Sequence, residues 1–95
     1  MDKFFYIRLF AGLNFFVPEK LKQRNIRLPY RGKQSVKDAV ESIGVPHTEF
    51  GMISLNGQMV GMEEYISEND QLIVYPHFYQ LMPVESNKST DEEET

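Results

Sequence analysis

The chain has 95 residues, 41% of them hydrophobic and 25% charged, with a formal charge of −4 and no cysteine. This length suits one small domain. Its longest early apolar stretch, Phe4 to Ile7, is far shorter than the about 20 residues of a membrane-spanning helix, so we expect a cytoplasmic protein with no membrane partner. The lack of cysteine excludes disulfides and thiolate sites, and with only two histidines we expect neither a metal nor a cofactor.

Two strands are predicted in the first third of the chain. Residues 3–10 alternate between two sides, which is typical of a strand, and both of its faces carry aromatic residues. Residues 25–30 predict a second strand, and Pro29 favours an edge position because proline cannot donate to a strand ladder. Between the strands we expect a turn or short helix anchored by Phe15 and Phe16.

One helix is predicted, over residues 36–43. Ser35 followed three residues later by Asp38 resembles a capping box. The apolar side chains then recur at helical spacing, at Val36, Ala39, Val40 and Ile43. Such a stripe needs a sheet to cover.

The turn Asn56-Gly57 predicts a hairpin, because both of these residue types accept positive φ. The remaining segments are strands at residues 52–55 and 58–60, a polar connection at 63–70, and a strand at 71–78. This order, with a single helix, predicts an α+β protein with a ubiquitin-like β-grasp fold. We expect a mixed sheet of four to five strands, with the first and last strands parallel at its centre and one main helix on one face.

The end of the chain differs in composition from the rest. Residues 79–95 carry five acidic residues and one lysine. Such a segment buries too little apolar surface to offset the entropy of ordering it. We therefore predict a domain over residues 1–81 and a disordered acidic tail over residues 82–95.

Several segments resemble known families. FAGL near residue 10, the Asn56-Gly57 turn and Tyr75-Pro76 are similar to bacterial sulfur-carrier proteins of molybdopterin and thiamine synthesis. SVKDAVESIGVPHTEF, ISLNGQMV and NDQLIVYPHF resemble, more specifically, the ubiquitin-like domain of the Mut-seven C-terminal RNase-associated family, over residues 4–78. This resemblance implies a β-grasp module of bacterial or archaeal type whose surface binds other proteins.

Each resemblance also departs from its family. A sulfur carrier needs a C-terminal Gly-Gly, but Gln80 and Leu81 stand where the glycines belong and no glycine follows Gly61. One alternative is therefore a diverged sulfur-carrier-like protein that lacks the C-terminal Gly-Gly. The acidic run at residues 91–94 is consecutive, so it does not converge on a metal as the ligands of an RNase site do. The alternative that the RNase resemblance implies is therefore an RNA-associated module that works with a separate RNase.

No catalytic residue is predicted. His47 and His77 have no nucleophile or convergent carboxylate close in the sequence, and Ser35 is better explained as a helix cap. We therefore expect structural or solvent-facing histidines and a protein that is not an enzyme.

The open sheet face is the first candidate surface. If Phe5 and Ile7 face the helix, the opposite face displays a set of mostly aromatic and aliphatic side chains: Phe4, Tyr6, Arg8, Ile73 and Tyr75. Such a patch commonly marks a contact surface, so we predict a protein partner or self-association there. In the alternative, Phe15, Phe16 or residues 79–82 cover this face.

A basic stretch is the second candidate. Residues 1–37 carry nine Lys or Arg and two acidic residues, whereas residues 38–78 carry seven acidic residues and no Lys or Arg. Possible nucleic-acid contacts are Arg27, Arg31 and Lys33. The first 78 residues are neutral overall, unlike most nucleic-acid-binding domains, and the basic stretch could instead pair with acidic surfaces. The prediction is therefore a non-catalytic ubiquitin-like module acting through protein contacts on its open sheet face.

Overall fold

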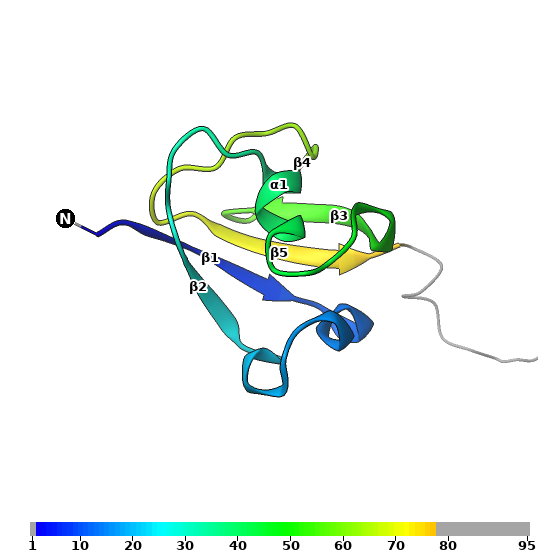
Figure 1. Cartoon of the computed structure of the whole chain (residues 1–95). Coiled ribbons are helices and arrows are strands. Elements are labelled where there is room, and N and C mark those ends of the chain that lie inside the picture. Colours follow the sequence, from blue (N-terminus) through cyan, green and yellow to red (C-terminus); the bar gives the residue numbers. More distant parts are fainter. Residues whose placement is uncertain (1, 78–95) are drawn as a thin grey trace, which may run out of the picture.

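The computed structural model describes residues 2–77, so the predicted tail at residues 82–95 and the end of the predicted domain lie outside it. Five strands form one sheet in the order β2-β1-β5-β3-β4. Their bounds are β1 Phe4–Leu9, β2 Asn25–Pro29, β3 Phe50–Leu55, β4 Gln58–Val60 and β5 Gln71–Pro76. Figure 1 shows β1 and β5 side by side, and these two strands pair in parallel while the other neighbours are antiparallel. The predicted β-grasp topology is confirmed, with β2 at an edge.

The single α-helix of residues 2–77, α1 Val36–Glu41, lies across one face of the sheet (Figure 1). Its side chains Val36, Ala39 and Val40 are completely buried. They meet the alternate strand residues that point to the same side, namely Phe5, Ile7, Leu9, Ile53, Leu72 and Val74. The stripe that predicts the helix is therefore also the stripe that forms the core.

The helix begins where the sequence predicts and ends earlier. The Ser35 hydroxyl accepts a hydrogen bond from the backbone N–H of Asp38 at 3.1 Å, which confirms the predicted cap. The predicted end at Ile43 is wrong by two residues. The N–H groups of Ile43 and Gly44 bond to carbonyls three residues back, which tightens the last turn, and Gly44 then adopts φ 105°, which ends the helix.

Two 3-10 helices, Ala11–Phe16 and Glu19–Leu21, connect β1 to β2. This confirms a turn of short helices, but Phe15 as an anchor is wrong because its side chain is 78% exposed. With about three residues per turn, Leu13 and Phe16 point to the same side, and Leu13 and Val17 are the buried anchors. Phe15 instead meets the Phe16 ring edge-on, with 5.5 Å between centroids.

Asn14 is a buried polar side chain that holds this connection together. Its amide Nδ2 donates to the carbonyls of Leu9 at 3.1 Å and Ala11 at 3.0 Å. Its Oδ1 accepts from the backbone N–H of Gln23 at 2.6 Å. Ala11 and Gln23 both have positive φ, so they lie in irregular turns outside the regular hydrogen-bond ladders. The Asn14 amide supplies the hydrogen-bond partners of backbone groups in these two turns.

The predicted hairpin is confirmed, with φ 52° at Asn56 and φ 91° at Gly57. Its first strand begins at Phe50, earlier than predicted, after a 3-10 turn at His47–Glu49. Gly51 leaves room there, because a Cβ at this position would lie 2.9 Å from His77 Nδ1 and 3.1 Å from His77 Cα. The start of β3 and the residue after β5 therefore approach closely.

The connection before β5 is only partly polar. Ile66 is 2% exposed and belongs to the core, although residues 63–70 read as a polar segment. The N–H of Val36 donates to the carbonyl of Glu64 at 2.8 Å, and Ser35 forms a bridge with Tyr65. This connection therefore fixes the start of the helix. Within residues 2–77, no helix has the length and apolar character needed to cross a membrane.

Candidate functional site

All five residues predicted on the open sheet face lie on that face. In the register of the sheet, Tyr6 is opposite both Arg27 on β2 and Gln71 on β5. Arg8 is opposite Ile73, and Tyr75 is opposite Met52 on β3. Because paired residues point to the same side of a sheet, these side chains form one surface on the side away from α1. Its predicted members are Phe4, Tyr6, Arg8, Ile73 and Tyr75.

The structure adds three exposed side chains to this surface. Phe10 is 48% exposed, and its ring centroid lies 5.2 Å from that of Tyr75. Met52 is 37% exposed, and Met59, opposite the face residue Ser54, is 56% exposed. The signal for Phe10 was the same alternation that predicts β1. The methionines follow only from the hairpin register.

Two contacts across strands order the open face near β2. The Arg27 guanidinium lies over the Phe4 ring at 4.3 Å from its centroid, a cation–π arrangement. The amides of Asn25 and Gln71 form two reciprocal hydrogen bonds of 2.9 and 2.7 Å. Asn25 is on β2 and Gln71 is on β5, so this amide pair reaches across β1. By the register it crosses β1 between Tyr6 and Arg8.

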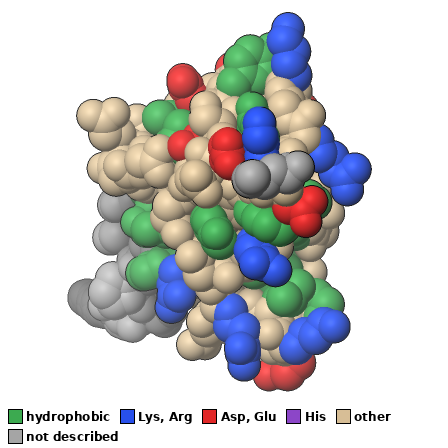
Figure 2. Space-filling model, turned by 90° about the vertical axis from the view of Figure 1, so that its left-hand side faces the viewer, with side chains coloured by type: hydrophobic (Ala, Val, Ile, Leu, Met, Phe, Trp, Pro, Cys, Tyr) green, Lys and Arg blue, Asp and Glu red, His purple; other side chains and the backbone are tan. Residues whose placement is uncertain are grey.

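The charge on this face has one sign. Its strand positions carry Arg8 and Arg27, and in the described part of the chain none of them carries an acidic residue. Figure 2 looks at the molecule from the left-hand side of Figure 1 and keeps the vertical direction. In its lower part, toward the β2 side of the sheet, several Lys and Arg side chains lie beside hydrophobic side chains, and an acidic group lies at the lower edge.

The predicted nucleic-acid residues are divided by the fold. Arg27 lies on the open face beside Phe4, whereas Arg31 and Lys33 are exposed in the loop between β2 and α1. The loop turns through Gly32 and Lys33, which both have positive φ. The structure therefore places one of the three basic residues on the aromatic surface and the other two in the loop that follows β2.

The residues proposed to cover the face are now placed in part. Phe16 packs against the hydrophobic core, and Phe15 remains exposed against Phe16. Residues 79–82, the other proposed cover, lie outside the described residues.

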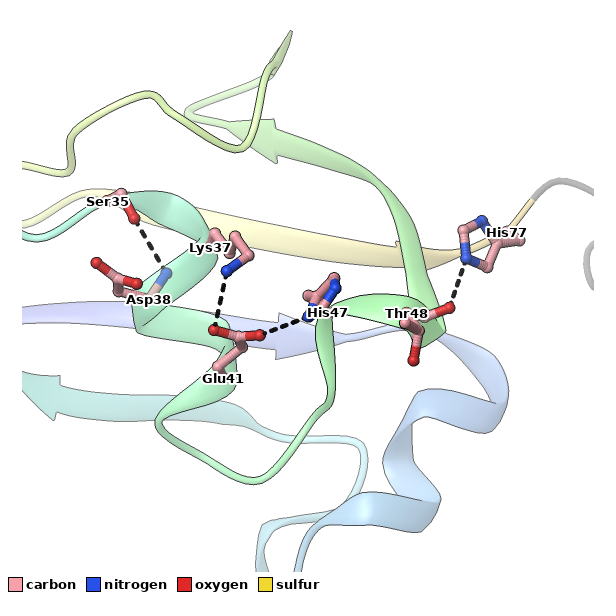
Figure 3. A network of polar contacts seen from close by, with 7 residues as sticks. All are labelled: Ser35, Lys37, Asp38, Glu41, His47, Thr48 and His77. Atoms are coloured by element: carbon pink, nitrogen blue, oxygen red, sulfur yellow. Dashed lines mark hydrogen bonds and ion pairs between the residues drawn. The ribbon is translucent and has the colours of Figure 1, made fainter.

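The two histidines take part in separate polar contacts. In Figure 3 the Glu41 carboxylate lies between Lys37 and His47, with Oε1 at 3.4 Å from Lys37 Nζ and Oε2 at 3.0 Å from His47 Nδ1. His77 Nε2 lies 2.7 Å from the carbonyl oxygen of Thr48. These contacts join the end of α1 to the following turn, and the turn to the end of β5.

The pKa of Glu41 reflects this arrangement. Desolvation at the helix end raises the pKa of this carboxyl, but the opposing effect of Lys37 and His47 is larger, so the pKa lies below its ordinary value of 4.5. The ionised form is therefore favoured in the folded state. Glu41 is accounted for by this packing, and within residues 2–77 no three His, Asp or Glu side chains gather as a metal site requires.

Known structures are similar to this fold. Two crystal structures of small archaeal modifier protein 1 (SAMP1) from Haloferax volcanii each superimpose with a TM-score of 0.56 at 17% identity. They cover 78% of this chain and 94% and 97% of their own chains. At this identity the likeness concerns the fold alone.

Comparison at the level of sequence identifies the family. Among curated proteins none matches this chain. A family model described as Mut7-C ubiquitin matches residues 3–82, which confirms the resemblance in the helix exit, the hairpin and the last strand. The chain belongs to the Mut7-C ubiquitin family.

Proposed function

We propose that this protein is a non-catalytic binding module that acts through protein–protein contacts on its open sheet face. The observation that supports this proposal is the continuity of that face across β2, β1, β5 and β3. It combines the aromatic side chains Phe4, Tyr6, Phe10 and Tyr75 with the arginines Arg8 and Arg27. Aromatic residues and arginine are the types enriched at the hot spots of protein interfaces.

Burial on the opposite side explains why this face is available. The single helix covers the side of the sheet that carries Phe5, Ile7 and Leu72, and these residues are almost completely buried. Among the described residues α1 is the one α-helix. A strand with one wet face normally alternates apolar with polar residues, yet β1 places Phe4 and Tyr6 on its wet face. A partner that covers these rings removes their apolar surface from water.

The test uses the immobilised protein to capture its partner, and sedimentation to measure self-association. Parent protein should retain a defined partner or form a dimer, and the Tyr6→Ser, Tyr75→Ser double variant should lose that interaction while its circular dichroism stays unchanged. Equal capture by both proteins would contradict the proposal. Recovery of an adenylating enzyme would favour the diverged sulfur-carrier alternative instead.

A second candidate is the RNA-associated module that works with a separate RNase. The observation that favours it is the Arg27 guanidinium over the Phe4 ring, because stacked aromatic and basic groups on an open sheet can hold unpaired bases. Recovery of a ribonucleoprotein in the same capture experiment would favour this candidate.

A further inference from the structure

The outer edge of β2 carries unpaired backbone groups next to a cavity. In the described part of the chain β2 pairs with β1 alone and lies at the end of the sheet. The N–H of Tyr30 donates to the carbonyl of Lys3 at 2.8 Å. This hydrogen bond shows which residues of β2 direct their backbone groups toward β1. Along an antiparallel strand the backbone groups of successive residues point alternately toward and away from the neighbouring strand. Asn25 and Arg27 therefore direct their N–H and C=O groups away from β1.

A cavity of about 390 Å³ lies on the helix side of this edge. It is lined by Phe5, Leu28, Pro29, Arg31, Gln34 and Ser42. The Gln34 side-chain oxygen Oε1 is buried and has no hydrogen-bond partner within the described residues. A buried acceptor without a donor costs about 1–3 kcal/mol, so a turn of the Gln34 side chain toward a donor on a ligand in the cavity would be favoured.

The charge around the edge selects the chemistry of the occupant. Residues 20–37 contain seven Lys or Arg and no acidic residue. Lys22 and Lys37 form ion pairs with Glu19 and Glu41, so the argument for the edge rests on Arg27 and Arg31. On the open-face side the edge presents Arg27, and on the cavity side it presents Arg31. Pairing of two β2 strands would bring the arginines of both edges close together, which disfavours a second copy of this chain.

We propose that the edge of β2 binds an acidic peptide in extended conformation, which adds a strand to the sheet. The peptide backbone pairs with the outward groups of Asn25 and Arg27. Its side chains alternate, so acidic residues on one side meet Arg27 while residues on the other side enter the cavity beside Arg31 and Gln34. A threonine there provides both a methyl group for the apolar wall and a hydroxyl donor for Gln34. This site is separate from the tyrosines of the proposed function.

The test uses a blocked, fluorescent eight-residue peptide in which Glu and Thr alternate. Parent protein at about 150 mM salt should bind it. Two control peptides should bind about tenfold more weakly: one with Lys in place of Glu, and one methylated on alternate backbone nitrogens, which removes the donors that a strand ladder needs. Binding should also slow hydrogen exchange of the Arg27 amide about tenfold.

Variants separate the edge from the open face. Arg27→Glu should lower the affinity for the peptide about tenfold, whereas Arg8→Glu, with the same change of charge one strand further in, should lower it less than about threefold. Gln34→Leu should weaken binding without loss of thermal stability, because it removes the unpaired acceptor. The Tyr6→Ser, Tyr75→Ser variant should bind the peptide as the parent does, so failure of the open-face proposal would leave this result intact.

The proposal is overturned if the methylated peptide binds as tightly as the unmodified one, or if Arg27→Glu and Arg8→Glu have equal effects. It is also overturned if the peptide leaves exchange of the Arg27 amide unchanged. Dimerisation through β2 in place of peptide binding would identify a second copy as the occupant and would likewise overturn it.

Discussion

The Arg27 guanidinium lies over the Phe4 ring, 4.3 Å from its centroid, and joins two features that are far apart in the sequence. Phe4 belongs to the aromatic face of β1, and Arg27 belongs to the basic stretch. On the sequence they indicate different partners, a protein and a nucleic acid. In the folded chain they form one surface. Experiments must therefore compare the effects of substitutions and the salt dependence of binding to separate the two functions.

Truncation of two tyrosines tests the open face. Changing Tyr6 and Tyr75 to Ser should leave the fold intact, because both side chains lie on the side of the sheet away from the core. Partner capture or self-association should weaken by more than about 2 kcal/mol, the scale of hot-spot truncation. Phe15→Ser is the matched control, since that aromatic side chain is 78% exposed but lies in the connection after β1. Equal effects of the two variants would contradict a specific open-face site.

The basic residues give a competing forecast in the same assay. If the protein binds RNA, changing Arg27, Arg31 and Lys33 to Glu should abolish binding, and the parent's affinity should fall steeply with salt. The tyrosine variant should then matter little. We expect the opposite ranking for protein partners, with the tyrosine variant more damaging and only a weak salt dependence. A titration of both variants over salt concentration decides between them.

Val40 tests the helix and its packing. Its side chain is completely buried between α1 and the sheet, so Val40→Asp places an unpaired charge in the core. We expect a loss of several kcal/mol, enough to unfold a domain whose total stability is roughly 5–15 kcal/mol. Gln58→Asp, at an exposed hairpin position, is the control and should melt close to the parent. A Val40→Asp protein with parental melting would show that the helix packs elsewhere.

Asn14 tests the connection between β1 and β2. Asn14→Ala leaves the carbonyls of Leu9 and Ala11 and the N–H of Gln23 without their partner. We expect a loss of about 2–4 kcal/mol in the free energy of unfolding, measured by urea denaturation, since each buried unpaired group is costly. Asn14→Asp keeps the acceptor for Gln23 but loses both donors, and it should also destabilise the fold. A change below about 0.5 kcal/mol for both would show that water replaces the amide.

Glu41 gives a pH dependence with a definite sign. Its pKa in the folded chain lies below 4.5, so its stabilising contribution is present above the unfolded-state pKa and is lost as pH falls through the folded-state value. The parent should therefore melt at a higher temperature than Glu41→Gln near neutral pH. The difference should shrink as pH falls below 4.5 and vanish once the carboxyl is protonated in both states. A constant difference across this range would assign the effect to packing rather than charge.

Much of the architecture follows from local sequence. The alternation of β1, the helical stripe with its Ser35 cap and the Asn56-Gly57 turn each specify an element through backbone and side-chain preferences within a few residues. The order of these elements, with a single helix and a closing strand, matches the β-grasp arrangement, so this topology and the residues of the open face were predictable.

The tertiary structure decided what depends on contacts between distant segments. Ile66 looks like part of a polar loop, but the loop crosses the start of α1, and its side chain fills the core. Phe15 looks like an anchor, but the phase of a 3-10 helix turns it outward and buries Leu13 instead. The free edge of β2 follows from the strand order, and the buried oxygen of Gln34 is found only in the packed structure. Sequence patterns specify which face of an element is apolar, whereas the neighbour that covers it, or leaves it open, is set by packing between elements.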